Sequence, residues 1–176
     1  LPLNGDEGSL TVNSETKIDG IVPTVESVSA LSQAGTYIID DKVNMKIEFS
    51  QSVTVSGVPF IELATGTNLS RAYYTSGTNT RSLVFEYTVV DGDHSLDLNY
   101  SGIESLSSGT ILDFSGNGAE LDLPSVDSEN ALAQKSDIII DGLRPEVESA
   151  IFLSPDGGYG IDDSISIGLV FSEPTY

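Results

Sequence analysis

The chain has no cysteine and no tryptophan, a single histidine, and only seven lysine and arginine residues against 27 aspartate and glutamate residues. The lack of cysteine excludes disulfide bonds, thiolate zinc sites and a cysteine nucleophile. One histidine, His94, leaves little basis for histidine catalysis or a multi-histidine metal site. The net charge of −20 opposes nucleic-acid binding, which needs clustered cations. The longest apolar runs, such as 138–140, are too short for membrane insertion.

The residues that are present suit a folded domain. A chain of 176 residues with 39% hydrophobic residues, seven tyrosines and six phenylalanines can bury a core of its own. Wholesale disorder needs a lower hydrophobic content. We therefore expect a soluble, acidic, globular protein.

The sequence repeats itself at an offset of 122 residues. Over the 54 overlapping positions, 21 are identical without a gap. The longer matches pair 18–20 with 140–142, 25–27 with 147–149, 39–41 with 161–163 and 49–50 with 171–172. A period this long is too large for a solenoid unit and fits a self-contained domain. We expect a tandem-repeat array in which 1–20 is the C-terminal end of a preceding repeat, 21–142 a complete repeat, and 143–176 the N-terminal part of a following repeat.

The local pattern within the complete repeat is β throughout. Apolar and polar residues alternate along 43–49 and along 82–90, as they do in strands with one buried face. Shorter predicted strands are 25–31, 59–63, 71–75, 96–100, 111–114 and 137–141, and one short helix is predicted over 128–135. Many short strands separated by glycine turns predict an all-β sandwich, with a jelly roll or a small barrel as the alternative.

Four segments resemble the tandem immunoglobulin-like repeats of giant bacterial surface proteins. IDGIVPTV at 18–25 resembles their DGTAPTV junction, and FSE at 171–173 resembles the end of their second strand. YTVVDGD at 87–93, followed by DLNY at 97–100, resembles their YTV-x-x-GD…DLDY segment, and ILDFSGN at 111–117 resembles IKDAAGN. The motifs keep their order and cover nearly the whole chain. Gln51 departs from the pattern, since Glu173 stands at the matching position of the next repeat.

The resemblance implies an immunoglobulin-like β-sandwich in a secreted or bacterial cell-surface protein, such as an RTX-type biofilm adhesin or a related extracellular fibre. Such repeats space a terminal ligand-binding module from the cell, and calcium usually stiffens the array. The expected partners are neighbouring repeats of the same polypeptide or fibre, and a host or biofilm glycan or protein.

Acidic residues at strand ends are the candidate calcium ligands. Asp40, Asp41, Asp91, Asp93 and Asp141 are expected at the pole facing the following repeat, because strands in a simple sandwich alternate in direction. Asp113 and Asn117 are expected at the opposite pole near Asp19, and Glu173 is the candidate in the next repeat. Calcium takes six to eight oxygen ligands, which acidic loops supply. For any single one of these residues turn formation is the favoured explanation, whereas the high negative charge favours at least one calcium ion somewhere in the array. No complete EF-hand loop is present.

Catalysis is not expected. His94 adjoins Asp93 and Ser95, but neighbours on a strand point to opposite faces, and no oxyanion motif is present. We therefore predict a non-enzymatic spacer. Two alternatives stay open at this point: a glycan- or protein-binding sandwich module, and a subunit of a self-assembling filament or surface layer. The tyrosines Tyr73, Tyr74, Tyr87 and Tyr100 could line a sugar-binding face, although tyrosines in sheets more often pack in the core.

Overall fold

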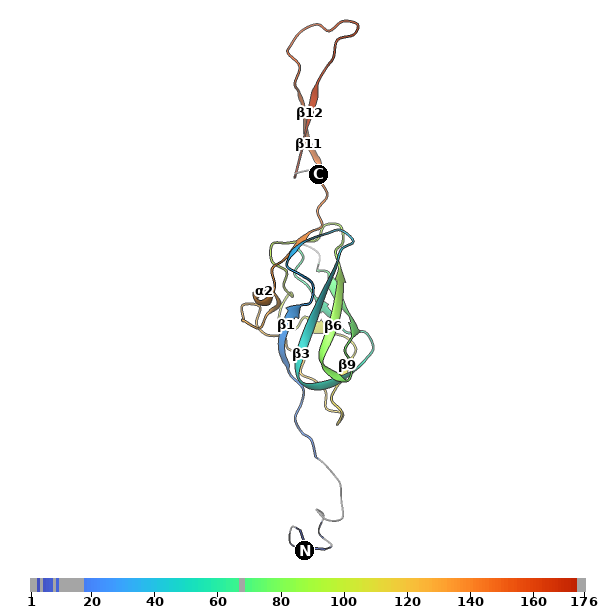
Figure 1. Cartoon of the computed structure of the whole chain (residues 1–176), viewed down its shortest axis with the longest axis vertical. Coiled ribbons are helices and arrows are strands. Elements are labelled where there is room, and N and C mark those ends of the chain that lie inside the picture. The colour runs from blue at the N-terminus through green and yellow to red at the C-terminus, as the bar shows by residue number, and fades with distance from the viewer. Residues whose placement is uncertain (1–2, 4, 8, 10–17, 67–68, 174–176) are drawn as a thin grey trace.

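The computed structural model describes residues 3, 5–7, 9, 18–66 and 69–173 (Figure 1). Most of the predicted tail of a preceding repeat, 1–20, lies outside these residues. The strands are Val25–Ala30 (β1), Gly35–Ile38 (β2), Lys42–Ser56 (β3), Phe60–Glu62 (β4), Arg71–Ser76 (β5), Thr80–Thr88 (β6), His94–Ser95 (β7), Leu106–Ser107 (β8), Thr110–Leu112 (β9), Ile138–Asp141 (β10), Val147–Phe152 (β11) and Ile167–Phe171 (β12). One short helix, α2, spans Leu132–Lys135. The all-β prediction is confirmed.

A seven-stranded antiparallel sheet forms most of the central body (Figure 1). Its strand order is β1-β3-β6-β5-β4-β8, and β9 pairs with the far end of β3. The alternating residues of β3 and β6 face each other in register, with Met45 opposite Phe85 and Ile47 opposite Leu83. These four side chains are fully buried, together with Phe49. The alternation seen in the sequence therefore selects the core face, as predicted.

A second, three-stranded sheet has the order β2-β10-β7. Strand β10 pairs in parallel with β2 and antiparallel with β7. Ile138 and Ile140 of β10 are buried in the same core cluster as the large sheet's residues, whereas Ile139 points outward. Leu98, Tyr100 and Leu132 complete this core from the connecting segments.

Some predicted elements differ in the structure. Residues 96–100 were predicted as a strand, but only Tyr100 forms a bridge, with Leu63, because the Asn99 side chain bonds the Tyr100 amide and the Val126 carbonyl. Strand β3 continues to Ser56, because beyond the register break after Glu48 it pairs again with β6 at Val53 and then with β9 over residues 54–56. The predicted helix over 128–135 begins only at residue 132, because residues 128–131 form a turn.

Strands β11 and β12 form a separate hairpin beyond the body (Figure 1). In the described part of the chain they pair only with each other. Val147 pairs with Phe171 and Phe152 with Ile167, with a register break between residues 147 and 149. Strands β1 and β3 show the same pairing 122 residues earlier, where Val25 pairs with Phe49, Ala30 pairs with Met45, and the break lies between residues 25 and 27.

Candidate functional site

The predicted ligand residues fall at two ends of the central body. At the entry end, where residues 18–24 reach β1, Asp19 contacts the 113–117 loop that carries Asp113 and Asn117. At the exit end, where the chain leaves β10 for β11, Asp93 and Asp91 contact Gly142 and Arg144. The division into two poles matches the placement expected from strand direction.

Asp113 organises the entry end. Its buried carboxylate accepts 2.8 Å hydrogen bonds from the backbone amides of Ser115 and Asn117 and from the Asn117 side-chain amide. Burial raises the pKa of this carboxyl, but the hydrogen bonds from Asn117, Ser115 and Gly116 outweigh it, so the pKa lies below its ordinary value. The ionised carboxylate thus holds the loop in one conformation.

The loop in turn holds the incoming segment. Ser115 Oγ donates to Asp19 Oδ2 at 2.9 Å, and Asn117 Nδ2 donates to the Asp19 carbonyl at 3.2 Å. Gln51 Nε2, from β3, donates to the Ile21 carbonyl at 2.8 Å and lies 3.4 Å from Asp113 Oδ2. Side chains from two distant parts of the domain therefore fix residues 19–21.

Asp93, at the exit end, faces inward. Its side chain is 1% exposed and accepts hydrogen bonds from Tyr87 Oη at 2.6 Å, from Ser70 Oγ at 2.8 Å and from the Val90 amide at 3.2 Å. Burial, the hydrogen bond to Asp93 and its negative charge together raise the pKa of Tyr87. Asp93 therefore closes the end of the core instead of facing the junction.

The other exit-end acids form turns or line the junction. The backbone of Asp40 has a positive φ of 72°, and Asp41 accepts a 2.9 Å hydrogen bond from the Ile38 amide. Asp91 forms an ion pair with Arg144 at 2.9 Å. Asp141 and Glu173 both line an open cleft of about 550 Å³ between the body and the hairpin.

Glu173 differs from the other candidate acids in its hydrogen bonding. Its Oε1 atom is buried and has no hydrogen-bond partner in the part of the chain that the structure describes. Arg144, Leu143 and Pro145 line the same cleft. The resemblance to calcium-stiffened repeats raises the question whether these acids can hold an ion.

The described residues show no preformed calcium site. Among them, no three histidine, aspartate or glutamate side chains come together in a way that could hold a metal. The carboxylates of Asp113 and Asp93 already accept bonds from N–H and O–H donors, and Asp91 is paired with Arg144. Calcium binding stays a prediction.

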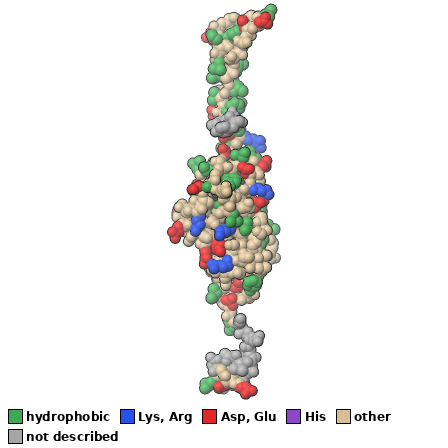
Figure 2. Space-filling model, in the orientation of Figure 1, with side chains coloured by type: hydrophobic (Ala, Val, Ile, Leu, Met, Phe, Trp, Pro, Cys, Tyr) green, Lys and Arg blue, Asp and Glu red, His purple; other side chains and the backbone are tan. Residues whose placement is uncertain are grey.

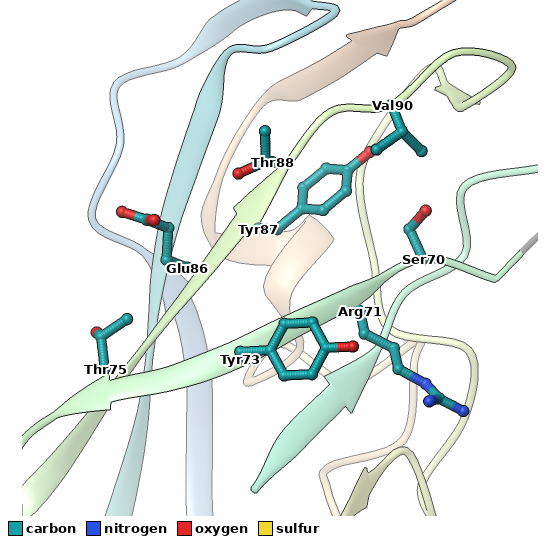
Figure 3. A pocket seen from close by; sticks show the side chains of 8 residues that line it. All are labelled: Ser70, Arg71, Tyr73, Thr75, Glu86, Tyr87, Thr88 and Val90. Atoms are coloured by element: carbon teal, nitrogen blue, oxygen red, sulfur yellow. The ribbon is translucent and has the colours of Figure 1, made fainter. Parts of the chain in front are cut away.

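A shallow groove of about 370 Å³ lies on the exposed face of the large sheet (Figure 3). Tyr73 of β5 is 49% exposed there, and its ring pairs with Phe60 at 6.1 Å between centroids. The Arg71 guanidinium stacks on Phe60 at 4.2 Å. Of the four tyrosines considered for a sugar-binding face, Tyr87 and Tyr100 are core residues and Tyr74 packs partly buried against the core, which leaves Tyr73 as the exposed one. The sequence pattern did not indicate that Arg71 would line this groove.

The face around the groove is balanced in charge. Figure 2 shows basic and acidic side chains interspersed on the central body. The ion pairs are Lys42–Glu86 at 2.7 Å, Lys46–Glu48 at 3.4 Å, Arg71–Glu62 at 3.9 Å and Arg81–Glu26 at 2.8 Å. Exposed pairs of this kind contribute about 0–1 kcal/mol each, so they add little to the stability of the domain.

Comparison with protein-family models, curated proteins and solved structures gave no match. In the described ranges, no helix has the length and hydrophobicity needed to cross a membrane.

Proposed function

We propose that this chain is a non-enzymatic spacer, consisting of one complete repeat and parts of two others from a tandem array in a secreted or cell-surface protein. The observation that carries the proposal is the pairing of β11 with β12, which matches that of β1 with β3 residue for residue at an offset of 122. A shared register break at the same position is hard to obtain from unrelated hairpins. In this proposal each repeat is an immunoglobulin-like sandwich.

Hydrogen bonds outside the ladders support the same equivalence. Ser32 Oγ accepts from the Asn44 amide at 2.8 Å, and Ser154 Oγ accepts from the Ser166 amide at 2.8 Å. The backbone φ is 72° at Asp40 and 73° at its counterpart Asp162. These matching local features support the proposal that the hairpin is the start of a further repeat.

The hairpin carries the inner face of a domain without the rest of the core. Met45 and Ile47 are fully buried in the complete repeat, whereas their counterparts Ile167 and Leu169 are 64% and 55% exposed. Patches of exposed apolar side chains mark surfaces that are covered in the working molecule. We infer that strands equivalent to those after residue 51 cover this face in the array.

A spacer of this kind acts by its length. Each repeat has its own core, and strands of roughly eight residues at about 3.3 Å per residue, with their turns, add on the order of 40 Å per repeat. Pro23 and Pro145 restrict the backbone at the two junctions to extended conformations. The negative charge keeps neighbouring chains apart and soluble.

A chimera tests the proposal. Appending residues 51–142 directly after Ser172 supplies the hairpin with strands in the register of the complete repeat. We expect a second cooperative unfolding transition, an increase of about 40 Å in the maximum dimension from X-ray scattering, and weaker binding of the dye ANS than in the parent chain. A chimera carrying Leu169→Lys is the matched control, because it places a charge in the new core. If the chimera keeps the ANS binding and length of the parent, the hairpin is not the start of a repeat.

A second candidate is a glycan-binding module, and the Tyr73 groove is the observation that favours it. An exposed ring beside the arginine fork of Arg71 provides a stacking surface and several donors, which saccharide recognition requires. Screening the chain against a glycan array, with Tyr73→Ala as the variant and Tyr159→Ala as an exposed-tyrosine control, separates this candidate from the spacer. Binding that depends on Tyr73 alone would support it.

A further inference from the structure

We propose that Gln51, Ser115 and Asn117 form a binding site for the segment that precedes the repeat, and that the Gln51 amide makes the bridge that a cation would otherwise make. The site lies within this chain and depends on the proposed function only for its role between repeats. It concerns residues for which the resemblance implies calcium, and whose described side chains instead hydrogen-bond to the incoming segment.

Each of the three side chains donates to a different acceptor of the incoming segment. Ser115 Oγ reaches the Asp19 carboxylate, Asn117 Nδ2 reaches the Asp19 carbonyl, and Gln51 Nε2 reaches the Ile21 carbonyl. The Ile21 amide donates to Asp19 Oδ1 at 3.1 Å, so the segment is itself folded into a turn that presents these acceptors. The donors and the segment are therefore complementary at three points.

Gln51 holds two acceptors together. Its Nε2 lies 2.8 Å from the Ile21 carbonyl and 3.4 Å from Asp113 Oδ2, and an amide nitrogen carries two hydrogens. Two oxygens facing each other without a donor or a cation between them repel. A bound cation would offset this repulsion by its charge. Here the neutral Gln51 amide offsets it by donating a hydrogen bond towards each oxygen.

The counterpart of Gln51 in the hairpin is Glu173, which removes the donor. An ionised glutamate only accepts hydrogen bonds. Glu173 Oε1 is buried without a partner among the residues described, in a cleft that Leu143, the counterpart of Ile21, also lines. The junction at Gln51 is therefore closed by an amide donor. The junction at Glu173 lacks this donor and needs a cation or a proton in its place.

The experiment uses the full chain and compares wild type with Gln51→Glu, Gln51→Leu and Gln33→Glu. Gln51→Glu removes the donor and adds a charge, and Gln51→Leu removes the donor alone. Gln33→Glu adds the same charge at an exposed loop and is the matched control. Each protein is studied in EDTA and in 5 mM calcium, roughly the range in which extracellular modules bind calcium. The readouts are melting temperature and hydrogen exchange of the backbone amides at 19–22 and 24.

We expect wild type and Gln33→Glu to behave alike with and without calcium. Gln51→Glu should melt lower in EDTA. The amides of Ile21 and Thr24, which are hydrogen-bonded while the segment is held in place, should exchange faster by about tenfold, since opening of the segment is eased by the loss of one hydrogen bond. Calcium should restore both values in Gln51→Glu and should leave Gln51→Leu in its faster-exchanging state.

Three results would overturn the proposal. Calcium could protect 19–22 and 24 in wild type, which would mean that a cation makes the bridge. Gln51→Glu could match Gln33→Glu in EDTA, which would mean that Gln51 holds nothing. Calcium could fail to restore Gln51→Glu, which would mean that the amide does not stand in for a cation. All readouts lie within one repeat and its leading segment, so they do not depend on the outcome of the chimera.

Discussion

The Tyr87 hydroxyl donates a 2.6 Å hydrogen bond to Asp93 Oδ2, and both side chains are 1% exposed. This contact joins the end of β6 to the turn from which the chain enters β7. Asp93, which the sequence suggested as a metal ligand, thus lies at the polar edge of the core.

Replacing Tyr87 by Phe should therefore destabilise the domain. The substitution keeps the ring and removes one donor from a buried carboxylate, which costs about 1–3 kcal/mol. Urea unfolding of the full chain measures the change. Tyr73→Phe is the control, because the Tyr73 hydroxyl has no hydrogen-bond partner among the described residues, and it should alter stability by less than about 0.5 kcal/mol. Equal stabilities for both variants would mean that the hydrogen bond contributes nothing.

The central core residue of β6 gives the largest expected effect. Phe85 is fully buried and lies opposite Met45, with Tyr74 at 6.0 Å between ring centroids. Replacing Phe85 by Ala should cost roughly 3–5 kcal/mol through lost burial and the cavity left behind. Phe114→Ala, at a phenylalanine that is 73% exposed, should change little. A cost below about 1 kcal/mol for Phe85→Ala would contradict the register of β3 and β6.

The strands that the sequence predicted well are those whose pattern is local. Alternation over 43–49 and 82–90 is enough to identify β3 and β6, because one face of each must be buried. Strand β2 was missed, because its pairing with β10 joins segments about a hundred residues apart and its four residues show no alternation. Two-residue strands such as β7 and β8 likewise leave no periodic signal.

The candidate site was only partly predictable for a similar reason. Strand direction predicts which acids share an end of the domain, and the contacts of Asp19 with the 113–117 loop agree with that placement. Burial is not visible in a short acidic turn, so the inward position of Asp93 could not be foreseen. Gln51 was noticed in the sequence as a lost charge, whereas its donated hydrogen bonds are apparent only in three dimensions.

Gly142 should tolerate no side chain at the exit end. A Cβ atom there would lie 2.5 Å from the Val90 carbonyl oxygen and 2.7 Å from that of Asp93. Gly142 also exchanges hydrogen bonds with Gly92 and Asp93, so the backbone cannot withdraw without losing them. We expect Gly142→Ala to destabilise the domain by about 1–3 kcal/mol, in the range of overpacking substitutions.

Gly20 provides the matched control for this prediction. It is the counterpart of Gly142 at the 122-residue offset, and a Cβ atom there would meet nothing within 4 Å. Gly20→Ala should leave the melting temperature of the chain unchanged. If the two alanine variants have the same melting temperature, the close approach at Gly142 does not constrain the domain.

Alkaline pH should weaken the fold through its buried tyrosines. An exposed tyrosine in the unfolded chain has a pKa of about 10. Burial raises the pKa of Tyr100 to about 12, and Tyr87 is shifted in the same direction by burial and by Asp93. Because the folded state favours the protonated phenol, this stability is fully present below pH 10 and is lost as the pH rises from 10 towards 12.

Urea unfolding at pH 8, 9, 10 and 11 measures this dependence. The free energy of unfolding should be flat to about pH 9 and then fall, and one pKa unit of difference corresponds to about 1.4 kcal/mol. Tyr100→Phe should lower stability at pH 8, because the hydroxyl donates to the Pro124 carbonyl, but should make the decline above pH 10 shallower. Tyr73→Phe, at the exposed groove, should keep the wild-type slope. If Tyr100→Phe declines as steeply as wild type, ionisation of Tyr100 does not limit stability at high pH.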